Sequence, residues 1–296
     1  MVNRKTAVTV LSAVGMALLL TASLVSILSE DGGKPFAVTA LRGTEVTLYG
    51  GEGIYNQDSV TKAILFRGFD WANLGVCLPL FVLGLIFYLR GSFWGTLLLA
   101  SVFTYLAYNY LIGVMGNAYN VLFPVWTALF AIGIFGLASV VGELNLSGIQ
   151  ERFGPKFPVK SLSIYVLFLG LFLLAQYGVE IVKSYISSQP PIALEHYTTY
   201  ELAAFELGLM VPLHLIGGIQ LLRKKAAGYL ISALLAFTAA MTFISLFLGG
   251  LILYYFNNQK TDLIDVIVPS VLALAASSFS IVIFAKSARG KGNIPA

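Results

Sequence analysis

The sequence predicts an all-α polytopic membrane protein with eight transmembrane helices in two parallel four-helix repeats, plus a small extracytoplasmic β-hairpin insertion after the first helix. Three observations predict this fold class. The chain is 58% hydrophobic and only 11% charged, which is far from the composition of a soluble domain. It contains eight long apolar runs, and residues 73–100 resemble residues 206–233 without a gap.

Each apolar run is close to the roughly 20 helical residues that cross a hydrocarbon core. The runs are 6–28, 71–89, 93–115, 121–142, 161–184, 200–222, 227–254 and 263–285. The first run follows Arg4 and Lys5, as a signal peptide would, but its apolar stretch exceeds the roughly 7–15 residues of a signal core. We therefore expect it to remain as the first transmembrane helix.

The distribution of Lys and Arg predicts the orientation, because cytoplasmic loops carry an excess of both. The richer set of helix ends carries Arg4, Lys5, Arg90, Arg152, Lys156, Lys160, Arg223, Lys224, Lys225, Lys286, Arg289 and Lys291. The opposite set carries Lys34, Arg42, Lys62, Arg67, Lys183 and Lys260. We predict a multi-pass protein of the cell membrane with both termini cytoplasmic and residues 29–70 extracytoplasmic. The net charge of +4 then reflects topology, and we expect no nucleic-acid partner.

The segment 29–70 is the one long insertion between predicted helices. Its stretches AVTALRG and TEVTLYG carry β-branched residues in partial alternation, which predicts a small β-hairpin. The following VTKAILFRGF begins after Ser59, a good helix cap, and has apolar residues on one face. This pattern predicts a short amphipathic helix that lies at the outer membrane interface.

The internal similarity covers a whole helical hairpin. Among the matched pairs are Gly75 with Gly208, Pro79 with Pro212, Gly84 with Gly217, Arg90 with Arg223 and Gly95 with Gly228. Convergence is the alternative, because Pro and Gly are common in membrane helices and Arg often marks their inner ends. The agreement of so many spacings favours duplication, a known route to membrane folds.

Duplication defines the predicted domain organisation. Residues 1–142 form the first repeat, residues 143–160 form a cytoplasmic linker, and residues 161–296 form the second repeat. Helices one to four then correspond to helices five to eight. Since four is an even number, the two halves have the same orientation, and their pseudo-axis runs along the membrane normal.

Sequence motifs for catalysis and for metal binding are missing. Cys77 is the only cysteine, which excludes an internal disulfide and a cysteine cluster. There is no phosphate-binding loop, no zinc-protease motif and no nucleophile elbow. We expect no cofactor and no metal, and an enzyme that acts on lipid or quinone is the least supported hypothesis.

The sixth helix carries two ionisable residues at membrane depth, Glu206 and His214. They are eight residues apart, so the helix places them about 12 Å apart in depth and about 80° apart around its axis. Pro212, between them, frees a backbone carbonyl and favours a kink. Because charged residues inside a membrane are costly, such groups face the bundle interior and have partners. A functional role and a structural role both stay open for this pair.

Further polar residues complete the predicted binding site: Glu180, Asp265, Asn73, Asn120 and Tyr108. The repeat places Asn73 at the position of Glu206, and Asn120 at the position of Asp265. Each of these residues also has a structural interpretation. An acid in a first helical turn is stabilising, and polar side chains join membrane helices by hydrogen bonds.

Two hypotheses for function follow. In the first, the protein is a transporter or permease that moves a cation or small polar solute through a polar cavity between the repeats. In the second, it is a non-catalytic accessory or scaffold subunit that binds a protein partner through residues 29–70. A homo-oligomer is compatible with both, and both require contact with the lipid bilayer.

Overall fold

The computed structural model describes residues 3–29, 32–144, 146, 148–256 and 264–287. Within these ranges, eight helical spans are long and apolar enough to cross a membrane, so the protein is an integral membrane protein. The spans are α1 (Arg4–Leu28), α2 to α3 (Val60–Leu89), α4 (Phe93–Gly116), α5 (Phe123–Val141), α7 (Val159–Ser187), α8 to α9 (Glu201–Leu222), α10 (Ala226–Phe256) and α11 (Ile264–Ser287).

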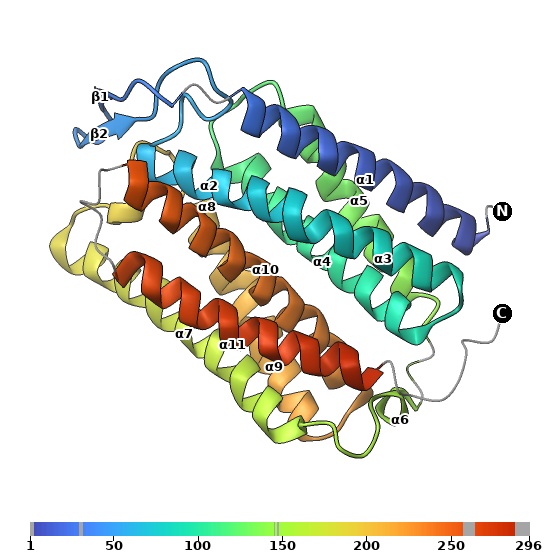
Figure 1. Ribbon diagram of the computed structural model, residues 1–296. Coiled ribbons are helices and arrows are strands. Elements are labelled where there is room, and N and C mark those ends of the chain that lie inside the picture. The colour runs from blue at the N-terminus through green and yellow to red at the C-terminus, as the bar shows by residue number, and fades with distance from the viewer. Residues whose placement is uncertain (1–2, 30–31, 145, 147, 257–263, 288–296) are drawn as a thin grey trace.

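The spans lie side by side, and the β-strands lie at one end of the bundle (Figure 1). We call this end the hairpin end. The beginning of α1 and the last described turn of α11 lie at the opposite end, where the short helix α6 (Ile149–Phe153) also lies. The central spans are α4 and α10, which pack against each other and are the most buried of the eight. Around them, α5 packs on α4, α11 on α10, and α7 on α9.

The predicted β-hairpin is confirmed. Strand β1 (Phe36–Thr39) pairs antiparallel with β2 (Glu45–Leu48), and Phe36 lies opposite Leu48. The connecting turn contains Gly43, which has a φ of 81°. Glycine adopts positive φ at little cost because it has no Cβ atom.

The predicted interfacial helix is wrong. Residues Val60–Ala72 form α2, which continues through residues 73–77 into α3 as one 30-residue span. The apolar face assigned to the membrane surface packs instead on α10. At Gly68 the two backbones come so close that a Cβ atom would lie 2.3 Å from the Gly249 nitrogen. A helix of α2's amphipathic pattern can therefore bury its apolar face against protein as well as lipid.

Two spans contain a π-helical segment between two α-helices. These segments are η1 (Asn73–Cys77) in the second span and η3 (Glu206–Met210) in the sixth. In each case an α-helix follows at once, with Pro79 or Pro212 in its first turn. Proline clashes with the carbonyl four residues earlier, and a wider turn relieves this clash. Pro212 therefore follows a local widening of the helix, and the kink expected at this residue stays a prediction.

The turns that follow these two spans share their backbone geometry. The helices end at Arg90 (φ −79°, ψ 2°) and at Arg223 (φ −79°, ψ 3°), and the next residues, Gly91 and Lys224, both have positive φ. A Cβ on Gly95 would lie 2.3 Å from the Tyr88 nitrogen, and a Cβ on Gly228 would lie 2.1 Å from the Leu221 nitrogen. The two hairpins thus close through equivalent glycine contacts. A further short helix, η2 (Ile192–Leu194), lies in the loop between α7 and α8.

Candidate functional site

A cavity of about 120 Å³ lies among α4, α7, η3, α9 and α10. Three of the residues predicted for the site line it: Tyr108, Glu206 and His214. They come from both halves of the chain, since α4 contributes Tyr108 and the sixth span contributes the other two. The volume is enough for several water molecules or one small ligand.

Glu206 is the carboxylate of this cavity. The π-segment η3 begins at this residue, and only 2% of its surface is exposed. The Tyr108 hydroxyl donates a hydrogen bond to Glu206 Oε1 at 2.7 Å. The other oxygen, Oε2, has no hydrogen-bond partner among the described residues. A buried carboxylate with one unsatisfied oxygen is costly, so this atom marks a place for a donor or a cation.

His214 lies two helical turns further along the same span and is also buried. Its Nδ1 atom is 2.8 Å from the Met210 carbonyl oxygen. A carbonyl can only accept, so Nδ1 carries the proton and Nε2 is the acceptor of the neutral ring. The neighbouring helix approaches closely here, since a Cβ on Gly170 would lie 2.8 Å from the His214 Cβ.

The rest of the cavity wall is aromatic and weakly polar. The aromatic members are Tyr108, Phe172, Tyr177 and Phe243. Thr238 and Thr242 supply hydroxyls from α10. The Thr238 hydroxyl donates to the Leu234 carbonyl at 3.0 Å. The Thr242 hydroxyl is buried and makes no hydrogen bond of normal geometry, although Tyr108 lies near it.

A second, larger cavity of about 490 Å³ lies toward the hairpin end, and we call it the vestibule. Gln176 and Tyr177 line both the vestibule and the Glu206 cavity. Because Tyr177 is buried and borders both spaces, its side chain forms part of the wall between them. The Lys and Glu residues of the described vestibule wall are Lys62, Glu180, Glu195 and Glu201.

Lys62 is the one cation among the described residues of the vestibule wall, and it is already paired. Lys62 Nζ lies 3.3 Å from Glu201 Oε1 and 3.6 Å above the centre of the Tyr197 ring. Glu180 and Glu195 therefore give the vestibule a net acidic wall. This charge would raise the local concentration of cations near the cavity entrance.

Glu180 and Asn120 lie outside the Glu206 cavity. Glu180 accepts hydrogen bonds from the Ala193 amide at 3.0 Å and from the Tyr200 hydroxyl, so it ties the loop after α7 to that helix. Asn120 accepts from the Leu122 amide at 2.9 Å and acts as a cap in the turn before α5. Asp265 lies in the first turn of α11, and its side chain is outside the part that the structure describes.

Asn73, the predicted counterpart of Glu206, is held in a different way. It is the first residue of η1 and is 1% exposed. Its Oδ1 atom accepts a hydrogen bond from the Tyr105 hydroxyl at 2.8 Å, and its Nδ2 atom is 3.5 Å from the Tyr110 hydroxyl. Two tyrosines of α4 thus satisfy this amide. It joins η1 to α4.

Two buried acids, Asp70 and Asp58, are not among the residues predicted for the site. Asp70 Oδ2 accepts hydrogen bonds from the Ser26 hydroxyl and, at 2.8 Å, from the Tyr55 hydroxyl. Its position three residues before Asn73 places both on one helix face, which is a signal that could have found it. The second acid, Asp58, directly precedes the helix cap Ser59, and nothing in the sequence marks its burial.

Asp58 joins three segments at the hairpin end. Its Oδ1 atom accepts hydrogen bonds from the Ala118 amide at 2.8 Å and from the Tyr197 hydroxyl at 2.6 Å. Burial raises the pKa of Asp58 to about 6, and the two hydrogen bonds oppose this rise. Nearby, Arg42 donates to the carbonyls of Tyr197 and Thr198. The insertion is thus fastened to the loop between α7 and α8.

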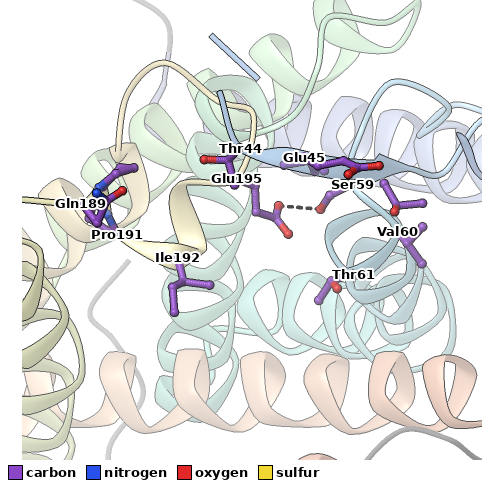
Figure 2. A pocket seen from close by; sticks show the side chains of 12 residues that line it. Thr44, Glu45, Ser59, Val60, Thr61, Gln189, Pro191, Ile192 and Glu195 are labelled. Atoms are coloured by element: carbon purple, nitrogen blue, oxygen red, sulfur yellow. Dashed lines mark hydrogen bonds between the residues drawn. The ribbon is translucent and has the colours of Figure 1, made fainter. Parts of the chain in front are cut away.

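A groove of about 480 Å³ separates β2 from the loop 189–195, and Figure 2 shows its lining. The Ser59 hydroxyl donates a hydrogen bond to Glu195 Oε2 at 2.5 Å across this groove (Figure 2). In the antiparallel ladder the backbone groups of alternate residues point away from the partner strand. The amides of Glu45 and Thr47 point away from β1, and no hydrogen bond from either amide occurs among the described residues.

Comparisons with protein-family models, curated protein sequences and solved structures gave no match. Among the described residues, no group of three or more His, Cys, Asp or Glu side chains could hold a metal ion. The class of the protein therefore follows from its fold and its site, without support from a relative. It is an integral membrane protein with a buried carboxylate at the wall of a cavity between its helices.

Proposed function

We propose that the protein is a transporter that binds a cation or a small polar solute at Glu206. One observation carries this proposal: Glu206 Oε2 is buried at a cavity wall and has no hydrogen-bond partner among the described residues. Ionisable groups inside a membrane are costly and typically mark substrate or ion pathways. The site also begins a π-segment in a span that Pro212 interrupts, and broken helices commonly form transporter sites.

The proposed architecture is two parallel four-helix repeats, residues 1–142 and 161–296, joined by the linker 143–160. The occurrence of η1 and η3 at matched positions supports it, as do the matched hairpin closures at Gly95 and Gly228. Gly15 of α1 lies against Phe81, and Gly170 of α7 lies against His214. In each half, the first helix thus contacts the second helix at an equivalent position, Phe81 or His214. Tyr108 comes from the first half, so the cavity lies at the junction of the proposed repeats.

The proposed orientation places the hairpin end outside the cell and both termini in the cytoplasm. The positive-inside distribution of Lys and Arg supports it. In this orientation the acidic vestibule faces the exterior. A solute would pass from the vestibule by Tyr177 to Glu206.

The test uses the purified protein in proteoliposomes on a solid-supported membrane. Gradients of Na⁺, K⁺, H⁺ and propylammonium are applied in turn, and the initial current is recorded. We expect at least one cation to give a current that Glu206→Gln reduces about tenfold or more, as the loss of a charged hydrogen bond predicts.

Glu143→Gln is the matched control for this substitution. Glu143 also accepts a tyrosine hydrogen bond at 2.7 Å, from Tyr88, but it lies outside the cavity. Its current should equal that of the native protein. Equal currents in the native protein and Glu206→Gln for every cation would contradict the proposed site.

A second candidate function is favoured by the outer edge of β2 at Glu45 to Thr47, which lies before the bridge that Leu48 forms with Ser59. Among the described residues, the groove beside this edge is lined by two acids, Glu45 and Glu195, and by no Lys or Arg. An extended, basic segment of a partner protein could add to β2 as a third strand, because unpaired edge amides accept such pairing. In this function the insertion 29–70 is the attachment site of an accessory subunit.

Proline substitution tests this second function. Thr47→Pro removes an outward amide of β2, and Ala37→Pro removes the opposed outward amide of β1. A fluorescent basic peptide of alternating Lys and Val should bind the native protein and Ala37→Pro, and it should fail to bind Thr47→Pro. Equal binding by both variants would exclude strand addition at β2.

A further inference from the structure

Among the described residues, two buried side-chain oxygens of the Glu206 cavity have no hydrogen-bond partner. They are Glu206 Oε2 and the Thr242 hydroxyl oxygen, and both line the same space. The described lining contains no lysine or arginine. A ligand that fits the site therefore brings a positive charge and more than one hydrogen-bond donor.

The remainder of the wall favours an apolar body on that ligand. The rings of Tyr108, Phe172, Tyr177 and Phe243 line the cavity together with Leu169 and Leu173. Aromatic faces attract organic cations, most strongly where water is excluded. An ion with a charged head and a short hydrocarbon tail matches both parts of the wall.

An inorganic cation matches less well. Hard cations of the Ca²⁺ or Mg²⁺ type take about six or more oxygen ligands in proteins. Here Glu206 Oε1 already accepts the Tyr108 hydrogen bond, and among the described residues Glu206 Oε2 and the Thr242 hydroxyl are the buried oxygens of the cavity without a partner. His214 Nε2 is a further acceptor at the wall, but it is a nitrogen, and these cations take oxygen ligands. A sugar also matches poorly, because its many hydroxyls would remain unpaired against the aromatic rings.

We propose that the Glu206 cavity binds a small primary alkylammonium ion, whose N–H groups donate to Glu206 Oε2 and Thr242 Oγ1 while its alkyl tail packs among the aromatic rings. This proposal rests on the proposed transport function and names its substrate class. The acidic wall of the vestibule concentrates such cations in front of Tyr177.

The test is direct binding of radiolabelled propylammonium to the purified full-length protein, measured by scintillation proximity. We expect saturable binding that Glu206→Gln weakens by about tenfold or more, since a charge-assisted hydrogen bond is lost. Thr242→Val should weaken it severalfold, because one neutral acceptor is removed. Glu143→Gln should bind like the native protein. Size-exclusion profiles and melting temperatures show that each variant is folded.

Competitors test the chemistry of the ligand. Unlabelled propylammonium should displace the label, whereas propanol, which lacks the charge, should not. Tetramethylammonium, which lacks N–H groups, should compete about tenfold more weakly. Equal competition by tetramethylammonium, or equal binding by Glu206→Gln, would overturn the proposal.

Failure of this proposal is distinguishable from failure of the transport function. A Glu206-dependent current carried by Na⁺, K⁺ or H⁺, without propylammonium binding, would overturn the alkylammonium assignment and leave the transporter in place. Saturable propylammonium binding without any current would support the site and overturn the transport function.

Discussion

The two π-segments have the same backbone and opposite surroundings. At η1 the first residue, Asn73, is satisfied by Tyr105 and Tyr110 of α4. At η3 the first residue, Glu206, is satisfied on one oxygen by Tyr108 and on the other by nothing in the described chain. The same helical backbone can therefore either pack against a neighbouring helix without a cavity, as at η1, or border a cavity, as at η3. Side-chain size on the neighbouring helix decides which of the two forms.

The size difference lies on α4 and α10. The offset that aligns Asn73 with Glu206 also aligns Tyr105 with Thr238 and Phe103 with Ala236. Tyr105 is fully buried against Asn73, whereas Thr238 lines the cavity. Phe103 packs edge-to-face on Phe81, with 5.4 Å between the ring centroids. The same offset aligns Phe81 with His214, and the counterpart of Phe103 is the small residue Ala236. Two aromatic side chains in the first half thus correspond to two small ones in the second.

The largest expected effect comes from filling the cavity. Thr238→Tyr gives the second half the side chain that the first half has, and its ring occupies the space beside Glu206. We expect propylammonium binding and cation current to fall to background while the protein stays folded, and binding plus circular dichroism checks both. Native binding with the added ring in place would show that this cavity is not the site.

The reverse substitution tests the contact of Tyr105 with Asn73. Tyr105→Thr opens a cavity beside Asn73 and leaves its amide oxygen unpaired. We expect the free energy of unfolding to fall by about 3 kcal/mol, as for other large-to-small changes in a core. Denaturation in mixed micelles measures this loss. Native stability would mean that Tyr105 does not hold η1 to α4.

Paired glycine substitutions test the proposed repeat. Gly95→Ala and Gly228→Ala each place a Cβ within 2.3 Å of backbone, so each should destabilise the protein by roughly 1–3 kcal/mol. Gly75→Ala and Gly208→Ala meet nothing within 4 Å and should be neutral or slightly stabilising. Thermal denaturation of all four variants measures this. Members of a pair that behave differently would count against equivalent geometry in the two halves.

The last prediction concerns the pH dependence of stability at the hairpin end, where Asp58 bonds to Ala118 and to Tyr197. Burial raises the pKa of Asp58 from 3.8 to about 6, so between these values the folded protein holds a proton that the unfolded chain releases. Stability should therefore fall as pH rises through this window. Asp58→Asn should flatten that slope, and the exposed Glu45→Gln should not. Melting temperatures between pH 4 and 7 measure the effect, and an unchanged slope in Asp58→Asn would contradict the assignment.

The spans and the hairpin were predictable because they depend on local patterns. Run length defines α1, α4 and α10, and the alternation of β-branched residues defines β1 and β2. The interfacial helix was predicted wrongly because an apolar stripe looks the same whether lipid or α10 covers it. The two parallel repeats and the cytoplasmic termini stay predictions.

The site was predictable only in part. Glu206, His214 and Tyr108 stand out because polar groups at membrane depth are rare. Their common cavity depends on which side chains α7 and α10 present, and single-sequence spacing does not encode that. Asp58 and Asp70 were missed because both acids are buried through contacts with residues far away in the chain, such as Tyr197 and Ser26.

The most direct test of the central claim is the initial cation current per folded protein in Glu206→Gln. We expect a current reduced by about tenfold or more, with native melting behaviour and with full current in Glu143→Gln. A native current in Glu206→Gln would contradict the claim that the unpaired carboxylate oxygen of the second half is the binding site.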